Sequence, residues 1–177
     1  MNREKVVLVN EKDTVIGEME KLAAHEQGKL HRAFSVFIFN ENGFLLLQQR
    51  ANDKYHGAGL WTNTCCSHPG LNEGVKESAI ERLEYEMGIK CELEFLFSFI
   101  YRSEVENNLI EHEYDHVYCG VTDMHPYPNA LEVQAWKWAK PETILNDLNE
   151  NPGNYTVWFK KIFERVMLAR KKSSGKN

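Results

Sequence analysis

The chain has 177 residues, of which 42% are hydrophobic and 27% charged, and its formal net charge is −5. This length and composition predict one compact domain with a substantial core and exclude a largely disordered chain. The negative charge argues against nucleic acid as the main partner, and no apolar run approaches the roughly 20 residues of a membrane span. With no signal peptide expected and four cysteines that do not form a disulfide framework, we expect a cytoplasmic protein.

The first half of the chain is predicted to form short strands separated by polar connections. Strands are expected at 6–9, 15–18, 33–39 and 44–49, and the last two are joined by an Asn40–Gly43 hairpin turn. The segment 21–31 is polar and contains a glycine, so we expect a loop with at most one helical turn there. It carries His25 and His31.

The second half alternates helices with strands. Apolar residues at helical spacing predict helices at 75–87, 141–148 and 155–170, and strands are expected at 91–101, 109–121 and, at a sheet edge, 133–138. A single domain is expected over residues 1–170, followed by a disordered basic tail at 171–177. The fold class is therefore α/β, an α/β/α sandwich with a mixed, largely antiparallel sheet.

The segment from Trp61 to Gly70 contains the most reactive side chains. It places Cys66 and His68 on a predicted path from strand to loop to helix, which would aim both side chains into the mouth of the loop. Taken alone, the segment is equally consistent with two inert buried thiols and a surface histidine.

The segment from Ile110 to Tyr118 contains the pattern H-E-x-x-H at residues 112–116. That pattern indicates a zinc protease only on a helix, where residues four apart share a face. The composition here predicts a strand instead, with Glu111, Glu113 and Asp115 on one face and both histidines on the other. We therefore reject the protease interpretation, and the two glutamates are either a functional carboxylate pair or part of a solvated strand face.

Three histidines at loop positions and the two glutamates form one candidate metal set. Imidazole and carboxylate donors in this number suit a Zn²⁺ or Mn²⁺ ion with five or six ligands. Spacing alone does not establish that they meet. The set comprises His25, His31, His68, Glu111 and Glu113.

The helix at 75–87 carries a damaged form of the Nudix box, G-x5-E-x7-R-E-U-x-E-E-x-G-U, in which U is aliphatic. Glu73 and Glu86 match, whereas Ser67, Glu81-Arg82 and Tyr85 depart from the pattern. Because two of the box's metal-binding carboxylates are replaced, diphosphate hydrolysis is not expected. Glu86 remains a candidate Mg²⁺ ligand, although each of these glutamates, taken alone, is consistent with a solvated helix face.

The stretch Trp61–Pro69, the Glu111-x-Glu113 strand, Ala23-Ala24-His25 and Leu30-His31 together resemble the type 1 isopentenyl-diphosphate Δ-isomerases, a branch of the Nudix superfamily. The resemblance covers residues 5 to about 165. It implies interconversion of isopentenyl and dimethylallyl diphosphates through a tertiary carbocation, in isoprenoid precursor biosynthesis. The alternatives are a Nudix pyrophosphohydrolase of a nucleoside diphosphate derivative and a non-catalytic Nudix-like domain. The first of these requires an intact R-E-U-x-E-E.

Position by position, the resemblance implies roles for individual residues. Cys66 and Glu113 match the catalytic pair, and Tyr101 and Trp158 match a pocket tyrosine and tryptophan. The His/Glu set would bind one Zn²⁺ or Mn²⁺ ion. Glu86 and the Cys66 carbonyl would bind a Mg²⁺ ion together with the substrate diphosphate. The diphosphate itself would be bound by four basic residues, Lys21, Arg50, Lys54 and Arg82. His56 stands where some members carry tryptophan, and the sequence indicates neither the native metal nor the oligomeric state.

Overall fold

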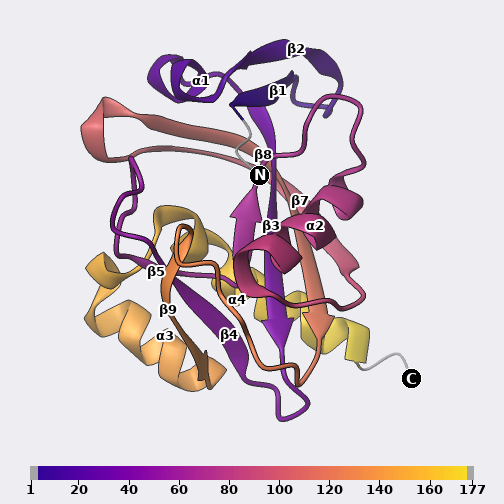
Figure 1. The fold of residues 1–177 in the computed structure, drawn as a ribbon, viewed down its shortest axis with the longest axis vertical. Helices are drawn as coiled ribbons and strands as arrows, with labels where there is room; N and C mark the ends of the chain where they lie inside the picture. Colours follow the sequence, from indigo (N-terminus) through magenta and orange to yellow (C-terminus); the bar gives the residue numbers. More distant parts are fainter. Residues whose placement is uncertain (1–3, 175–177) are drawn as a thin grey trace.

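Strand β3 (His31–Phe39) is the central strand in the computed structural model, which describes residues 4–174 (Figure 1). It pairs in parallel with β8 (Ile110–Val121) and antiparallel with β6 (Cys65–Ser67). The outer side of β8 pairs with β7 (Glu94–Glu104). The aromatic and β-branched composition of β3 suits a strand that is covered on both faces, and nearly all of its residues are buried.

The remaining strands attach to the two ends of β3. At its C-terminal end the hairpin leads into β4 (Leu45–Arg50), which pairs mainly with β9 (Val133–Ala139) and β5 (Trp61–Thr62). At its N-terminal end lies the hairpin of β1 (Lys5–Val9) and β2 (Val15–Glu20). Among the pairings between named strands in residues 4–174, only β3–β8 is parallel, which confirms the mixed, largely antiparallel sheet.

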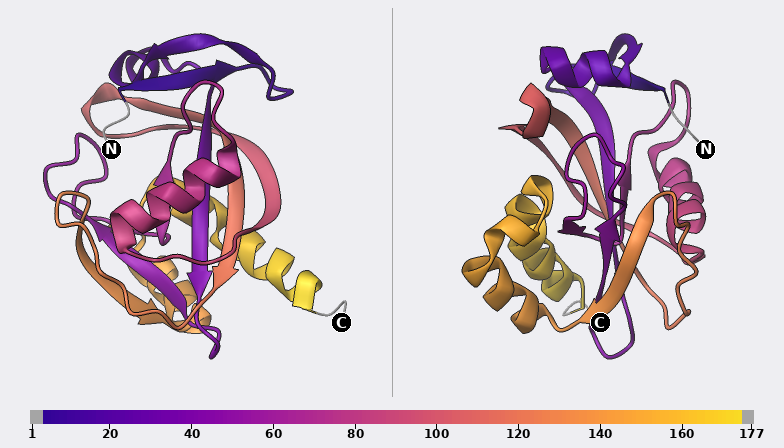
Figure 2. Two further views of the ribbon diagram at one scale, coloured as in Figure 1. Left: turned by 45° about the vertical axis from the view of Figure 1, so that its right-hand side comes forward. Right: turned by 60° about the vertical axis from the view of Figure 1, so that its left-hand side comes forward.

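Helices cover both faces of the sheet (Figure 2). On one face, α2 (Val75–Met87) packs against Phe34, Val36 and Ile38 of β3. On the other, α4 (Val157–Ser174) and α3 (Pro141–Glu150) cover Phe37 and Phe39. Because successive strand residues point to opposite faces, β3 contributes to both cores, and the predicted α/β/α sandwich is confirmed. Two short 3₁₀ segments, η1 (Glu106–Asn108) and η2 (Pro152–Asn154), lie in connections.

The segment expected to be a loop is a helix, α1 (Lys21–Gln27), which is two turns long. Ala24 and His25 are fully buried, and Gly28 ends the helix in the left-handed conformation with a φ of 60°. The expectation of at most one turn was wrong because packing, rather than local composition, stabilises so short a helix. The strand expected at 91–101 lies further along, at Glu94–Glu104.

The basic C-terminal segment also differs from expectation. Helix α4 continues to Ser174, so residues 171–174 of the expected tail are helical, with Lys171 and Lys172 in the last turn, where the helix dipole favours cations. Residues 175–177 lie outside the described residues. The single domain over 1–170 stays a prediction. Among the described residues, none of the helices combines the length and apolar composition that a bilayer crossing requires.

Candidate active site

A cavity of about 280 Å³ opens where β3, β6, β8 and the 51–60 loop meet. Cys66, on β6, and Glu113, on β8, both line it, so the thiol and the carboxylate face one space. His68, Glu111 and Trp158 also line this cavity. His25, His31 and Tyr101 lie behind the lining residues and contact them through polar atoms.

The register of β8 against β3 determines which side chains reach the cavity. His31 lies directly opposite Glu113, and Glu111, Glu113 and Asp115 are all buried on the inner face. The two remaining histidines of the strand point the other way. His112 Nδ1 lies 2.9 Å from the Gly28 carbonyl oxygen and His116 Nε2 lies 3.0 Å from Asp13 Oδ2. Rejection of the zinc-protease motif is therefore confirmed.

The tautomers of His25 and His31 follow from their backbone contacts. Nδ1 of His25 lies 2.6 Å from the Lys21 carbonyl oxygen, and Nδ1 of His31 lies 2.8 Å from the Lys29 carbonyl oxygen. Because a carbonyl only accepts, each Nδ1 carries a proton, and in the neutral ring the lone pair then lies on Nε2. Both Nε2 atoms are buried without a hydrogen-bond partner, an arrangement typical of imidazoles oriented to bind a metal.

These donors form two groups that share one histidine. The donor atoms of His25, His31, His68 and Glu113 lie within 4.8 Å of one another, and a second group joins His25 to Glu111 and His56. Glu111 Oε2 is buried and has no hydrogen-bond partner. The site thus fits a divalent cation with nitrogen and oxygen ligands, a donor set that suits Zn²⁺ and Mn²⁺ alike.

The acid–base groups of the cavity differ in protonation. Burial and the nearby Glu111 act to raise the pKa of Glu113, but the neighbouring imidazoles of His31 and His68 outweigh them and hold it at about 2. Burial raises the pKa of the Cys66 thiol. It also raises the pKa of Tyr101, whose hydroxyl donates to Glu113 Oε2 over 2.7 Å. The free protein therefore carries a carboxylate beside a protonated thiol and a protonated phenol.

The four basic residues expected at the diphosphate all line the cavity, which they reach from separate elements. Lys21 is the first residue of α1, Arg50 ends β4, and Arg82 lies on α2. Arg50 also lies over the Trp158 ring, with 5.2 Å from its Cζ atom to the ring centroid. The structure thus places one cationic wall beside the thiol and the carboxylate.

Helix α2 contributes only one of its glutamates to the cavity. Glu77, Glu81 and Glu84 are exposed, whereas Glu86 is buried and lines the cavity. Its two carboxylate oxygens accept hydrogen bonds from Arg82 Nε (2.7 Å) and Gln48 Nε2 (3.0 Å). The set of carboxylates that a Nudix hydrolase needs is therefore not assembled on this helix.

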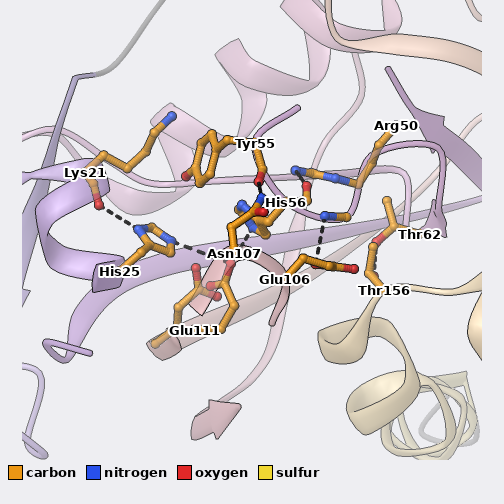
Figure 3. A network of polar contacts seen from close by, with 12 residues as sticks. Lys21, His25, Arg50, Tyr55, His56, Thr62, Glu106, Asn107, Glu111 and Thr156 are labelled. Carbon is orange, nitrogen blue, oxygen red and sulfur yellow. Dashed lines mark hydrogen bonds and ion pairs between the residues drawn. The ribbon is translucent and has the colours of Figure 1, made fainter. Parts of the chain in front are cut away.

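Two residues of the site escaped the sequence analysis. Glu132 accepts from Lys54 Nζ at 2.5 Å and from Arg82 Nη2 at 2.8 Å, so an acid lies among the cations. No motif surrounds it in the sequence. His56 was noted only as standing where some members of the family carry tryptophan, yet its Nε2 lies 2.5 Å from Glu111 Oε1 (Figure 3). The available signal was a histidine two residues after Lys54, followed by Gly57 and Gly59.

Comparison with known proteins assigns this geometry to a family. A NUDIX domain model matches residues 29–159. Isopentenyl-diphosphate Delta-isomerase 1 of Aromatoleum aromaticum is 49% identical over 167 residues, which cover 94% of each chain. Isopentenyl-diphosphate Delta-isomerase 2 of Photorhabdus laumondii is 50% identical over 159 residues, 90% of each chain. The chain belongs to the isopentenyl-diphosphate Delta-isomerase family.

Solved structures agree with this family at the level of the fold. DR0079 from Deinococcus radiodurans superposes with a TM-score of 0.76 at 20% identity, covering 92% of this chain and 98% of that one. The MutT protein of Methanosarcina mazei Go1 reaches 0.66 at 19% identity, covering 80% and 96%. Identities this low show the NUDIX fold alone. Membership of the isopentenyl-diphosphate Delta-isomerase family confirms the resemblance seen in the sequence.

Proposed function

We propose that this protein interconverts isopentenyl diphosphate and dimethylallyl diphosphate, a step of isoprenoid precursor biosynthesis. The observation that carries the proposal is that the Cys66 thiol and the Glu113 carboxylate line one cavity whose neighbouring wall is cationic. Moving a carbon–carbon double bond requires an acid and a base on the same five-carbon unit. A diphosphate requires cations set apart from the reacting carbons.

The reaction is a proton addition followed by a proton removal. A proton added to the terminal methylene carbon of isopentenyl diphosphate converts its double bond to a tertiary carbocation at C3. Removal of a proton from C2 then forms the double bond of dimethylallyl diphosphate. The pKa directions favour Sγ of Cys66 as the donor and the Glu113 carboxylate as the acceptor in this direction, with the roles reversed in the other.

Tyr101 and Trp158 serve the intermediate. The Tyr101 hydroxyl holds Glu113 Oε2 over 2.7 Å, so it orients the carboxylate and can relay a proton to it. Trp158 lines the cavity, and a ring face beside a carbocation stabilises it by about 0.5–2 kcal/mol. Phe34 adds apolar surface to the same cavity, which keeps water from the cation.

The metals belong to two places in this proposal. His25, His31, His68, Glu111 and Glu113 would hold one Zn²⁺ or Mn²⁺, which when bound polarises the Glu113 carboxyl group and fixes its geometry. Glu86 and the Cys66 carbonyl would hold a Mg²⁺ with the diphosphate. The diphosphate oxygens would be bound by Lys21, Arg50, Lys54 and Arg82. Lys54 and Arg82 would exchange their contacts with Glu132 for contacts with these oxygens. A cytoplasmic location is part of the proposal, because an acid that is a thiol must stay reduced.

One assay separates isomerase from hydrolase. The protein is incubated in D₂O with Mg²⁺, Mn²⁺ and isopentenyl diphosphate, and in parallel with a nucleoside diphosphate sugar, and both reactions are followed by ¹H and ³¹P NMR. We expect dimethylallyl diphosphate carrying deuterium, with no change in the ³¹P spectrum of the sugar. Release of phosphate or of a nucleoside monophosphate, without isomer, would overturn the proposal in favour of the pyrophosphohydrolase.

A further inference from the structure

His56 belongs to the second group of donors and has no assigned role in the site. That group, His25, Glu111 and His56, cannot be an independent metal site beside the first. The two groups share His25, whose Nδ1 is occupied by the Lys21 carbonyl oxygen at 2.6 Å. Only Nε2 of His25 is available, and one nitrogen lone pair binds one ion. His56 and Glu111 must therefore serve the same ion as the first group.

The contact between His56 and Glu111 indicates what His56 contributes to the binding of this ion. His56 Nε2 lies 2.5 Å from Glu111 Oε1, closer than two atoms that each bind one ion at about 2.1 Å normally approach each other, so this contact is a hydrogen bond that Nε2 donates and not a pair of metal ligands. A protonated Nε2 has no lone pair for a metal. Glu111 Oε2, by contrast, is buried without a hydrogen-bond partner. His56 thus holds one oxygen of Glu111 and leaves the other for the ion.

The His56 ring is itself held by aromatic neighbours. The ring centroid of Tyr55 lies 4.5 Å away and that of Trp158 lies 5.9 Å away at its edge. With an exposed fraction of 7%, the residue is also screened from water, which strengthens its hydrogen bond to Glu111. A buried donor held this way restricts the carboxylate to one orientation.

The backbone of His56 links this contact to the cationic wall. Its carbonyl oxygen accepts from Arg50 Nη2 over 3.1 Å, and the next residue, Gly57, donates its N–H to Glu106 Oε2 (Figure 3). Asn107 Nδ2 donates to the Tyr55 carbonyl oxygen over 2.8 Å. The 51–60 loop is therefore attached at its middle both to the metal-binding strand β8 and to the tip of the β7–β8 hairpin.

We propose that His56 is a positioning residue that orients Glu111 for the metal and, through the same residue's carbonyl, couples the metal centre to Arg50. The part that concerns Arg50 rests on the proposed function, because Arg50 is assigned there to the substrate diphosphate. The part that concerns Glu111 does not. Energetic coupling of this kind is reciprocal, so metal binding and diphosphate binding should strengthen each other.

The first test measures metal binding alone, by titrating the metal-free protein with Mn²⁺ and following the free ion by EPR. We expect His56→Ala to weaken Mn²⁺ binding by about 10–100-fold, the usual effect of losing a partner of a metal ligand. His56→Gln, whose amide nitrogen can donate from a similar place, should recover most of the affinity. Wild-type affinity in His56→Ala, or no recovery in His56→Gln, would overturn the proposal.

A matched control separates orientation of Glu111 from attachment of the loop. Asn107→Ala removes the hydrogen bond to Tyr55 but leaves the donor to Glu111 in place. It should raise the KM for isopentenyl diphosphate while keeping Mn²⁺ affinity within about twofold. Equal loss of Mn²⁺ affinity in Asn107→Ala and His56→Ala would mean that His56 acts only through loop packing, against the proposal.

Pulsed EPR of bound Mn²⁺ tests direct ligation. The imidazole nitrogen couplings should be the same in wild type and His56→Ala at saturating Mn²⁺, and loss of one coupling would make His56 a ligand and overturn the positioning role. These readouts need no isomerase activity. If the wild-type protein bound Mn²⁺ as expected but formed no dimethylallyl diphosphate, the proposed function would fail while the orientation of Glu111 by His56 would stand.

Discussion

Single side chains in this site obtain different protonation states from different surroundings. Cys66 has burial without a close cationic hydrogen-bond donor, so its pKa rises and the proton stays on sulfur. Glu113 is as enclosed, but it lies beside His31 and contacts His68 at 2.9 Å, so its pKa falls. An acid and a base can therefore coexist in one cavity at neutral pH.

Replacing the thiol tests this assignment. We expect Cys66→Ala to lower isomerase turnover by at least about 100-fold, because a general acid contributes 10²–10⁴-fold. Mn²⁺ affinity should stay within about twofold of wild type. The control is Cys119→Ala, which removes a thiol of β8 that does not line the cavity. This variant should retain turnover. Full turnover in Cys66→Ala would remove the thiol from the mechanism.

Lys21 makes substrate binding sensitive to alkaline pH. Burial and the neighbouring Lys54 and Arg82 lower its pKa, so it loses its charge at a lower pH than an ordinary lysine. Since the charged form attracts diphosphate, kcat/KM for isopentenyl diphosphate should fall on the alkaline side, at a lower pH than an ordinary lysine would cause, through a rise in KM. Lys21→Arg, which stays charged, should move this fall to higher pH. An unchanged profile in that variant would assign the fall to another group.

Helices and strands of this protein follow their local patterns where one face is buried and the other exposed. The alternation along β8 predicted which carboxylates share a face, and helical spacing predicted α2 over the residues observed. The pattern could not reveal α1, because its burial depends on packing against β8 and the β1–β2 hairpin. Nor could it place Glu132 and His56, whose partners lie 78 and 55 positions away in the chain.

The end of α2 provides a test of element geometry. Gly88 has a φ of 65°, and a Cβ atom there would lie 2.9 Å from the backbone oxygen of Tyr127. We therefore expect Gly88→Ala to lower the free energy of unfolding by about 1–3 kcal/mol, measured by urea denaturation. Gly153→Ala is the matched control, because nothing lies within 4 Å of its Cβ position and its stability should hold or rise slightly. Equal stabilities of the two variants would refute the steric argument.

At the scale of the whole molecule, the metal should stabilise the fold. Its donors come from α1, β3, the segment after β6, and β8, and the unfolded chain cannot hold them together. Mn²⁺ at 100 times its Kd should add about 2.7 kcal/mol to the free energy of unfolding. For a protein of this size, that corresponds to a rise in Tm of about 5–10 °C over the chelated protein.

Differential scanning calorimetry with and without a chelator measures this rise. His31→Ala, which lacks one donor, should respond much less to Mn²⁺ than the wild-type protein. A wild-type Tm that does not change on chelation would contradict the placement of a metal among these donors.

The NUDIX match begins at residue 29, after both Lys21 and His25. Helix α1 therefore contributes Lys21 to the cavity and His25, a proposed metal donor, from outside the matched region, and the carbonyl of Gly28 at its end accepts a hydrogen bond from His112 on β8. If the ion holds α1 in place through His25, backbone amides of residues 21–27 should exchange with deuterium faster in the chelated protein than in the metal-loaded one, while those of α2 should not. Departure of the ion and detachment of α1 would then be a single event. Because α1 also carries Lys21, a protein that has lost its metal would bind diphosphate more weakly.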